Sequence, residues 1–182
     1  MRAVRSGGRV NPVTRNRLVG LAIAVGLFVA DQAFKGYILH GLKLDLGQSH
    51  TLLPIFNYTL THNYGVSLGM FTAQSQEARW FLVAMTSVIA LVVTVWMLRE
   101  RKLADIVPLA LILGGALGNI KDRYDLGYVV DFLDLHFGEF RPFLIFNLAD
   151  AAITVGVLII LARSLLIREK APDQPADTAV ES

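Results

Sequence analysis

The stretch Phe143-Leu-Ile-Phe-Asn147-Leu-Ala-Asp150-Ala-Ala-Ile-Thr-Val155 is apolar enough for a membrane helix, yet it contains an aspartate. A second aspartate, Asp131, lies 19 positions earlier in the run Val129-Val130-Asp131-Phe132. An ionised carboxylate costs about 2.5–3.5 kcal/mol near a bilayer centre on insertion scales, so it is tolerated mainly where it is paired, hydrated or used. The two aspartates are therefore the first place to look for chemistry.

The whole chain is too apolar for an ordinary soluble domain. Of its 182 residues 54% are hydrophobic, and the mean hydropathy is +0.51. Four segments are long enough, or nearly so, to cross a hydrocarbon core at about 1.5 Å per residue: 18–38, 80–98, 103–120 and 144–166. The sequence therefore predicts an all-α membrane protein with four transmembrane helices.

The positive charges predict how these helices are oriented. Of the 17 Lys and Arg residues, five precede the first helix, three lie within 99–102 and three within 163–170. The long loop 40–78 holds only Lys43. The positive-inside rule then places both termini in the cytoplasm and the loops 40–78 and 121–143 outside. The pI near 9.0 reflects this topology, and we expect no nucleic-acid partner.

The chain divides into one membrane domain with two polar ends. Residues 1–16 form a basic arm and residues 167–182 a polar tail, and both are predicted to be disordered and cytoplasmic. No small-x-small cleavage site follows the first apolar segment, so we interpret it as a retained helix. Between the first two helices, Ile55-Phe-Asn-Tyr-Thr-Leu-Thr-His62 partly alternates, which predicts a small extracytoplasmic β-containing platform.

Two neighbouring carboxylates can hydrolyse a peptide without a metal or a nucleophilic side chain. Repulsion between like charges keeps one carboxyl protonated while the other is ionised. The ionised group acts as general base on a water, and the protonated group polarises the scissile carbonyl. Asp131 and Asp150 would titrate as such a coupled pair. The alternative is that Asp150 caps a helix start and Asp131 is a solvated loop residue.

Other polar residues are candidates for a supporting role. Asp31 and Lys35 are four apart on one helix face, which allows an ion pair that locks the helix end or serves the site. Asn63 and Gly65 can supply amide and backbone donors, or simply form a tight turn.

Asn147 and Arg123 also allow two interpretations each. Asn147 precedes Asp150 by one helical turn, so it can orient that carboxylate or cap the helix. Arg123 follows Asn119 at the outer end of the third helix, and its five donors suit carboxylates or carbonyls. Anchoring of the helix at the membrane interface is the alternative for Arg123.

The composition argues against other chemistries. The chain has no cysteine, which excludes disulfides, thiol nucleophiles and cysteine-based metal sites. Its four histidines are scattered, without a ligand pair at helical spacing, so we expect no metal. No Gly-rich phosphate loop appears in a strand-to-helix context, and we expect no cofactor.

Five sequence blocks, taken together, closely resemble the bacterial lipoprotein signal peptidases (signal peptidase II), a family of aspartyl intramembrane proteases. They are Asp31-Gln32-x-x-Lys35, Asn63-x-Gly65, Gly118-Asn119-x-x-Asp122-Arg123, Val129-Val130-Asp131-Phe132 and Phe146-Asn147-x-Ala149-Asp150. The resemblance covers about residues 17–166, with the blocks in order and at compatible spacing.

The resemblance implies a membrane-embedded aspartyl endopeptidase with Asp131 and Asp150 as its catalytic pair. The family removes the signal peptides of prolipoproteins, cutting before a cysteine that carries diacylglycerol. The resemblance further implies the bacterial inner (cytoplasmic) membrane, an active site towards the periplasmic face, membrane lipids as surroundings and inhibition by globomycin-type cyclic peptides. By motif matching, the residues expected to bind substrate or support the site are Asn63, Gly65, Asn119, Arg123, Asn147, Asp31 and Lys35.

Two other classes of function compete with this one. A small proton-coupled carrier would use Asp31 or Asp150 as a relay. A scaffold protein would use its buried polar groups only to hold its helices together. Loss of prolipoprotein maturation on changing Asp131 or Asp150 to Asn discriminates the peptidase from both.

Overall fold

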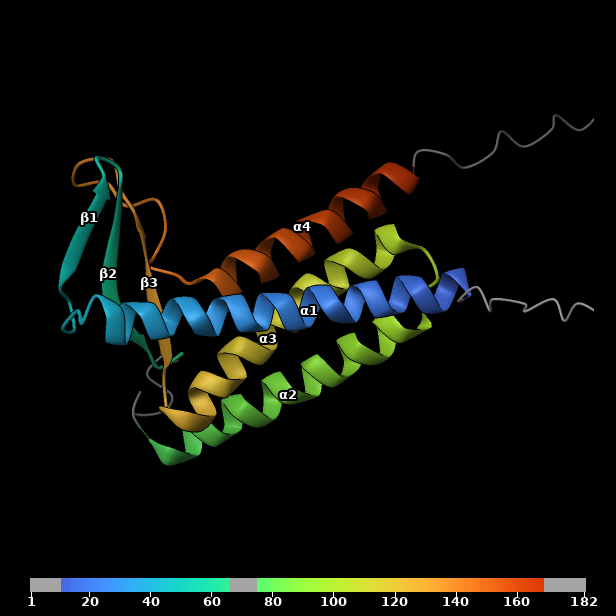
Figure 1. The fold of residues 1–182 in the computed structure, drawn as a ribbon, viewed down its shortest axis with the longest axis horizontal. Helices are drawn as coiled ribbons and strands as arrows, with labels where there is room; N and C mark the ends of the chain where they lie inside the picture. Colours follow the sequence, from blue (N-terminus) through green and yellow to red (C-terminus); the bar gives the residue numbers. More distant parts are fainter. Residues whose placement is uncertain (1–10, 66–74, 169–182) are drawn as a thin grey trace, which may run out of the picture.

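The computed structural model describes residues 11–65 and 75–168, which form four long helices with a small sheet at one end (Figure 1). In chain order the elements are α1 (Pro12–Gly36), continued by the π-helical turn η1 (Tyr37–Gly41), β1 (Ser49–Leu53), β2 (Phe56–Asn63), α2 (Gln76–Arg99), α3 (Leu103–Asp125), β3 (Val129–Leu135) and α4 (Leu148–Arg168). The sheet lies at the end of the bundle opposite the start of α1 and the end of α4.

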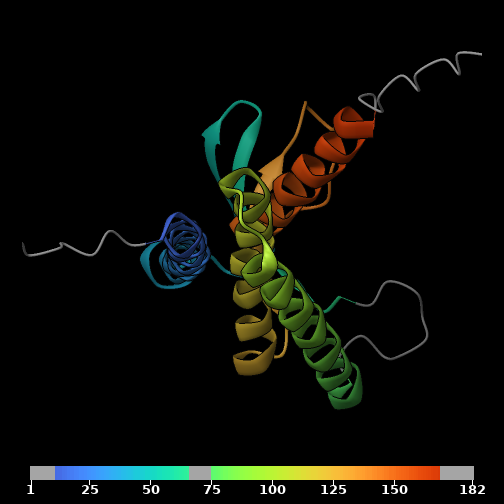
Figure 2. The ribbon, with the colours of Figure 1, turned by 90° about the vertical axis from the view of Figure 1, so that its right-hand side faces the viewer.

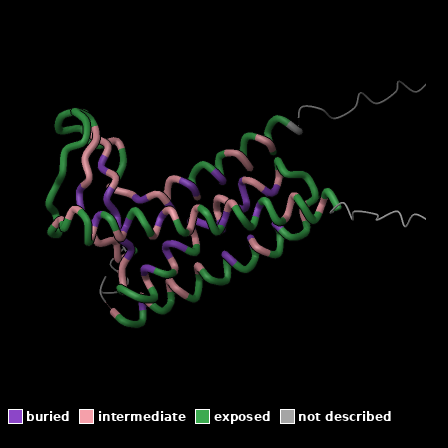
Figure 3. The backbone as a smooth tube through the Cα atoms, viewed as in Figure 1, coloured by how far each residue is buried: buried purple, intermediate pink, exposed green. Residues whose placement is uncertain are grey.

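The four helices are each long and apolar enough to span a membrane, which confirms the four predicted spans. Helix α3 lies in the middle and packs against the other three, with α1 on one side and α2 and α4 diverging on the other (Figure 2). Half of the most apolar window of α3 is buried, against 17–22% for the other helices. The outer helices expose most of their surface (Figure 3), as helices that face lipid do.

Glycines on α3 bring its neighbours close. A Cβ added to Gly114 would lie 2.6 Å from the carbonyl oxygen of Ala24 in α1. A Cβ added to Gly118 would lie 2.5 Å from Oδ2 of Asp31, so this position also leaves room for a buried carboxylate. Small residues let membrane helices approach closely, and here they also make space for polar groups between the helices.

The sheet draws strands from both long loops. It is antiparallel in the order β1-β2-β3, and Thr61 of β2 lies opposite Asp131 of β3. The predicted platform is therefore confirmed, but its extent differs from the expectation, because β3 comes from within the predicted loop 121–143. Asp131 and Asp134 interrupt the apolar pattern of β3, and all of β1 is exposed, so neither strand shows a clear alternation.

Several helix boundaries also differ from the expectation. The side chain of Asn11 accepts a hydrogen bond from the Val13 amide at 2.9 Å, and Pro12 suits a first helical position, so α1 begins inside the arm 1–16 that was predicted to be disordered. The last helix starts at Leu148 rather than near residue 144 and continues to Arg168, two residues into the predicted tail. The remainder of both predicted ends lies outside the described residues.

Candidate active site

Asp131 and Asp150 meet where the sheet joins the bundle, and Asn147 contacts both. Asp131 lies in β3 and is only 2% exposed, whereas Asp150 is the third residue of α4 and is half-buried. Nδ2 of the fully buried Asn147 donates to Oδ1 of Asp131 at 2.7 Å. The turn between sheet and helix thus joins the two carboxylates through one residue, Asn147, whose side chain donates to Asp131 and whose backbone amide donates to Asp150.

Asn147 and Asp150 also cap α4 reciprocally. The amide of Asp150 donates to Oδ1 of Asn147 at 2.9 Å, and the amide of Asn147 donates to Oδ2 of Asp150 at 3.3 Å. This is the pattern of a capping box, which satisfies two backbone donors at the helix start. The sequence left open whether these residues cap the helix or orient the site. In the structure they cap α4, and Asn147 also donates to Asp131.

Two more asparagines each donate to one of the aspartates. Nδ2 of Asn119 in α3 lies 2.8 Å from Oδ1 of Asp150. Nδ2 of Asn63, the last residue of β2, lies 2.9 Å from Oδ2 of Asp131. The amide of Gly65 donates to Oδ1 of Asn63 at 2.8 Å, which fixes the side-chain amide with its NH₂ towards the carboxylate. Asn63 therefore forms a turn with Gly65 and also contacts Asp131.

Lys35, Asp31 and Asp122 form a buried ionic triad beside Asn119. Lys35 Nζ lies 2.8 Å from Asp31 and 2.8 Å from Asp122, and all three side chains are at most 4% exposed. The predicted Asp31–Lys35 pair is therefore present, but sequence reasoning missed Asp122 as its third member. Asp122 follows Asn119 by three on the same face of α3, a spacing that marks it as a candidate for the same site but does not identify Lys35 as its partner.

The triad ties α1 and α3 to the two segments that carry the aspartates. Asp31 in α1 accepts from the amide of Ala149 at 3.1 Å, and Asp122 in α3 accepts from the amide of Val130 at 3.1 Å. Lys35 donates to Oδ1 of Asn119 at 3.3 Å. Because Ala149 and Val130 adjoin Asp150 and Asp131, the triad fixes the backbone positions of both.

Arg123 lies beside this network. A Cβ at Gly65, which has a φ of +76°, would lie 3.1 Å from the Arg123 guanidinium. Asp150, Asp131 and Asp122 are the acidic groups whose charges act on it. Its Nε is buried and has no hydrogen-bond partner within residues 11–65 and 75–168. The guanidinium therefore faces the site rather than the lipid, which disfavours simple anchoring.

The electrostatics of Asp131 suit proton transfer near neutral pH. Burial raises the pKa of Asp131 to about 7, and the neighbouring charge of Asp150 adds to this rise. Hydrogen bonds from Asn63 and Asn147 oppose the rise by stabilising the carboxylate. Such a pair can hold one proton at neutral pH while its other member is ionised.

Asp131 opens into a cleft of about 960 Å³. One wall consists of the end of β2 and the turn after it, with Asn63 and Gly65. The other wall is the segment 141–145, which leads into α4. The cleft thus gives a substrate chain access to the buried carboxylate from the sheet end of the bundle.

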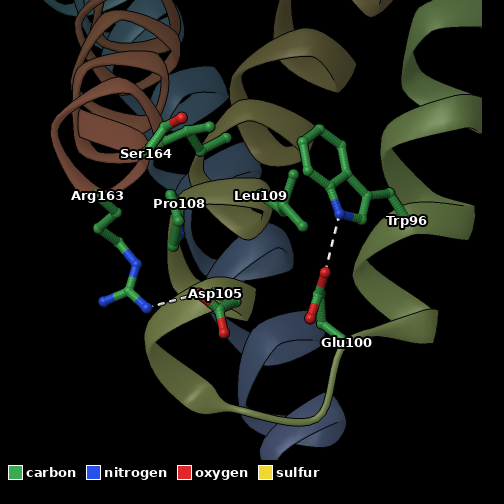
Figure 4. Close-up of a pocket in the computed structure, with 8 residues that line it drawn as sticks. Trp96, Glu100, Asp105, Pro108, Leu109, Arg163 and Ser164 are labelled. Atoms are coloured by element: carbon green, nitrogen blue, oxygen red, sulfur yellow. Dashed lines mark hydrogen bonds and ion pairs between the residues drawn. The ribbon is translucent and has the colours of Figure 1, made fainter. Parts of the chain in front are cut away.

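A second pocket lies at the far end of the bundle and differs in kind. It has a volume of about 290 Å³ between α2, α3 and α4 (Figure 4). Both of its acids are already engaged, since Asp105 pairs with Arg163 at 2.6 Å and Glu100 accepts from Trp96 at 2.9 Å. These contacts join the helix ends. Within the described part of the chain, no group of three or more His, Cys, Asp or Glu residues is placed to hold a metal ion.

Comparison with known proteins agrees with this arrangement. A model of the family "Signal peptidase (SPase) II" matches residues 23–166. The chain is 49% identical to the lipoprotein signal peptidase of Sphingopyxis alaskensis over 89% of this chain and 94% of that protein. It is 46% identical to that of Rhizorhabdus wittichii over 89% and 93%.

Two solved structures described as bacterial membrane enzymes share the fold. The first has a TM-score of 0.73 and 29% identity, covering 86% of this chain and 93% of its own. The second has a TM-score of 0.70 and 30% identity, covering 81% and 92%. With the family model spanning most of the chain and its relatives matched almost end to end, this protein belongs to the signal peptidase II family, the lipoprotein signal peptidases.

Proposed function

We propose that this lipoprotein signal peptidase is an aspartyl endopeptidase whose catalytic residues are Asp131 and Asp150. The family cleaves the signal peptides of prolipoproteins, and the proposal concerns how this chain does so. One observation carries it. Asn147 donates to Asp131 and exchanges capping hydrogen bonds with Asp150, so one residue links the two carboxyl groups, and Asp131 lines the cleft.

In the proposed reaction, a water lies between the two carboxyl groups. The ionised carboxylate removes a proton from this water, and the resulting hydroxyl attacks the scissile carbonyl carbon. The protonated carboxyl donates its proton to the carbonyl oxygen as the tetrahedral intermediate forms. Collapse of the intermediate breaks the C–N bond, and the amine of the new N-terminus takes up the proton that the base had accepted. One hydroxyl of the intermediate returns its proton to the carboxylate that had donated one, which leaves the new carboxyl group and restores the pair.

The remaining site residues have supporting roles in this scheme. Asn63 and Asn119 each donate to one carboxylate, which fixes its orientation. Arg123 is placed to bind a peptide carbonyl or to stabilise negative charge that develops in the transition state. Asp31 and Lys35 hold the helices that carry the site.

The substrate proposed for this chain is a prolipoprotein whose cysteine carries a diacylglyceryl group, cleaved just before that cysteine. Acyl chains confine a substrate to the membrane at about 0.8 kcal/mol per buried CH₂ and fix the depth of the scissile bond. We place the protein in the bacterial inner membrane with both termini cytoplasmic, because the basic residues gather at the end of the bundle opposite the sheet. The cleft then opens near the periplasmic interface, and globomycin-type cyclic peptides would inhibit by occupying it.

The test is cleavage of a diacylglyceryl prolipoprotein by the purified protein in detergent. Asp131→Asn and Asp150→Asn should each abolish turnover, and the double variant should be no worse than either, since the two residues act as a unit. Asp125→Asn is the matched control, because Asp125 is an exposed aspartate paired with Lys121 at the same end of the molecule. Full activity in either active-site variant would refute the aspartyl mechanism.

A further inference from the structure

Arg141 in the cleft wall is held by a buried carboxylate outside the network described above. Its Nε lies 3.1 Å from Oδ1 of Asp134 in β3. Asp134 is 1% exposed, and its other oxygen accepts from the hydroxyl of Thr59 at 3.0 Å. The side chain of Arg141 itself is 53% exposed.

Stabilisation of the fold is a weak explanation for the pair of Arg141 and Asp134. Burying a carboxylate against a single exposed cation is weak evidence for stability, since an apolar pair of similar volume often serves as well or better. Arg141 has five N–H donors, and only its Nε–H is engaged by a described residue. Asp134 thus orients the guanidinium and leaves its two NH₂ groups at the cleft.

The residues that follow Arg141 make the same wall strongly apolar. Phe143 and Leu144 line the cleft and are 63% and 89% exposed. They come five and four residues before Leu148, the first residue of α4, whose first turn carries Asp150. Along one wall the cleft therefore offers a cation and then apolar side chains, a short distance along the chain from a candidate catalytic carboxylate.

We propose that this wall is the subsite for the diacylglyceryl group of the substrate. Arg141 donates to the ester carbonyl oxygens of the glyceryl group, and Phe143 and Leu144 contact the start of the acyl chains. A glyceryl diester has this order of groups, with neutral acceptors next to hydrocarbon. Asp134 is a positioning residue that acts through Arg141. The inference rests on the proposed function, because it assigns part of the substrate to part of the same cleft.

The experiment compares two lipid-modified substrates that differ only in the glyceryl linkages, diester against dialkyl ether. Detergent micelles without phospholipid are used, so that a lipid phosphate cannot be the partner of Arg141. A charge-assisted hydrogen bond at a partly exposed site contributes roughly a tenfold difference in binding. Arg141→Ala should therefore raise KM for the diester about tenfold with little change in kcat, and should affect the ether far less.

Asp134→Asn and a matched control complete the design. Asp134→Asn should reduce the preference for diester over ether in the same direction, and adding it to Arg141→Ala should reduce that preference no further. A general loss of stability would lower both rates together and leave the preference unchanged. Lys121→Ala is the control, because Lys121 is a similarly exposed, ion-paired cation at the same end of the bundle but outside this cleft.

The outcomes separate this inference from the function on which it rests. If wild type cleaves the diester substrate and Arg141→Ala shows the same diester preference, the subsite assignment is wrong while the proposed function stands. If wild type cleaves neither lipid-modified substrate, or Asp131→Asn retains activity, the proposed function fails and the inference fails with it. A diester preference that falls only in the Arg141 and Asp134 variants supports the assignment.

Discussion

The buried triad around Lys35 makes a sharp prediction, because the chain contains a matched pair for comparison. Lys35 and Asp31 are an i,i+4 pair at 4% and 0% side-chain exposure, and Lys35 also contacts Asp122. Lys121 and Asp125 form an i,i+4 pair with exposures of 47% and 42%. The two pairs join the same residue types at the same spacing, and they differ in burial and in the second carboxylate that Lys35 contacts.

The expected magnitudes differ by several kcal/mol. Lys35→Met leaves two buried carboxylates without a counter-charge, and breaking a buried pair in this way costs about 3–5 kcal/mol. Lys121→Met removes an exposed pair of the kind that contributes about 0–1 kcal/mol. At about 2–4 °C per kcal/mol for a protein of this size, Lys35→Met should lower Tm by roughly 6–20 °C and Lys121→Met by only a few degrees.

Thermal unfolding of both variants in one detergent at pH 7 measures the difference. A second substitution tests the cause, since Asp31→Asn added to Lys35→Met removes one of the orphaned charges and should recover part of the lost stability. If Lys35→Met lowers Tm no more than Lys121→Met, or if adding Asp31→Asn lowers Tm further, the burial of uncompensated charge in the triad does not control stability.

Four further predictions concern the site. Because burial raises the pKa of Asp131 to about 7, kcat/KM should fall as pH rises above 7 and the shared proton is lost, and a flat profile to pH 9 would contradict this. The pKa of Asp131 is about 7 in the folded state and 3.8 in the unfolded state, so the folded state holds this proton more tightly. The stability of the protein therefore falls as pH rises from 3.8 to about 7. A pKa difference of about three units, at about 1.4 kcal/mol each, corresponds to about 4 kcal/mol. The free energy of unfolding of Asp131→Asn should therefore exceed that of wild type by up to about 4 kcal/mol at pH 8, and this difference should vanish by about pH 4. Gly65→Ala should reduce activity far more than Gly47→Ala, since both glycines have positive φ but only the Cβ at residue 65 meets Arg123; equal losses would assign the effect to backbone strain. A chelator should leave activity intact, and inhibition that added zinc reverses would oppose the aspartyl mechanism.

The sequence predicted the helices and singled out Asp150 because both follow from the cost of burial in a membrane. Asp131 lies in β3, outside the four spans, and was singled out by the apolar run around it and by the motif it shares with the family. Long apolar segments and a carboxylate inside one of them are visible without any knowledge of the fold. The strand β3 was less visible, since Asp131 and Asp134 break its apolar pattern for reasons that lie in the tertiary structure. Each of these carboxylates is satisfied by donors from other elements, Asn147 for Asp131 and Arg141 for Asp134.

The roles of individual polar residues were the hardest to predict. Sequence reasoning treated capping and service to the site as alternatives for Asn147 and Asp150, but a carboxylate has several lone-pair positions and can do both. Asp122 was missed because its partner Lys35 lies 87 positions away in the chain, and only the packing of α1 on α3 brings them together.

The reciprocal cap at the start of α4 has a consequence for how the protein can respond to selection. Asn147 and Asp150 hold the helix start, while Asn147 also contacts Asp131 and Asp150 is a member of the proposed catalytic pair, so a change at either position alters two properties at once. An inhibitor that contacts mainly these residues would leave the bacterium few viable substitutions with which to escape. The segment 142–145 caps no helix, and an exchange of one apolar residue for another there can reshape the cleft while keeping an apolar contact for the acyl chains. Resistance mutations should therefore accumulate on that side of the cleft as exchanges among apolar residues.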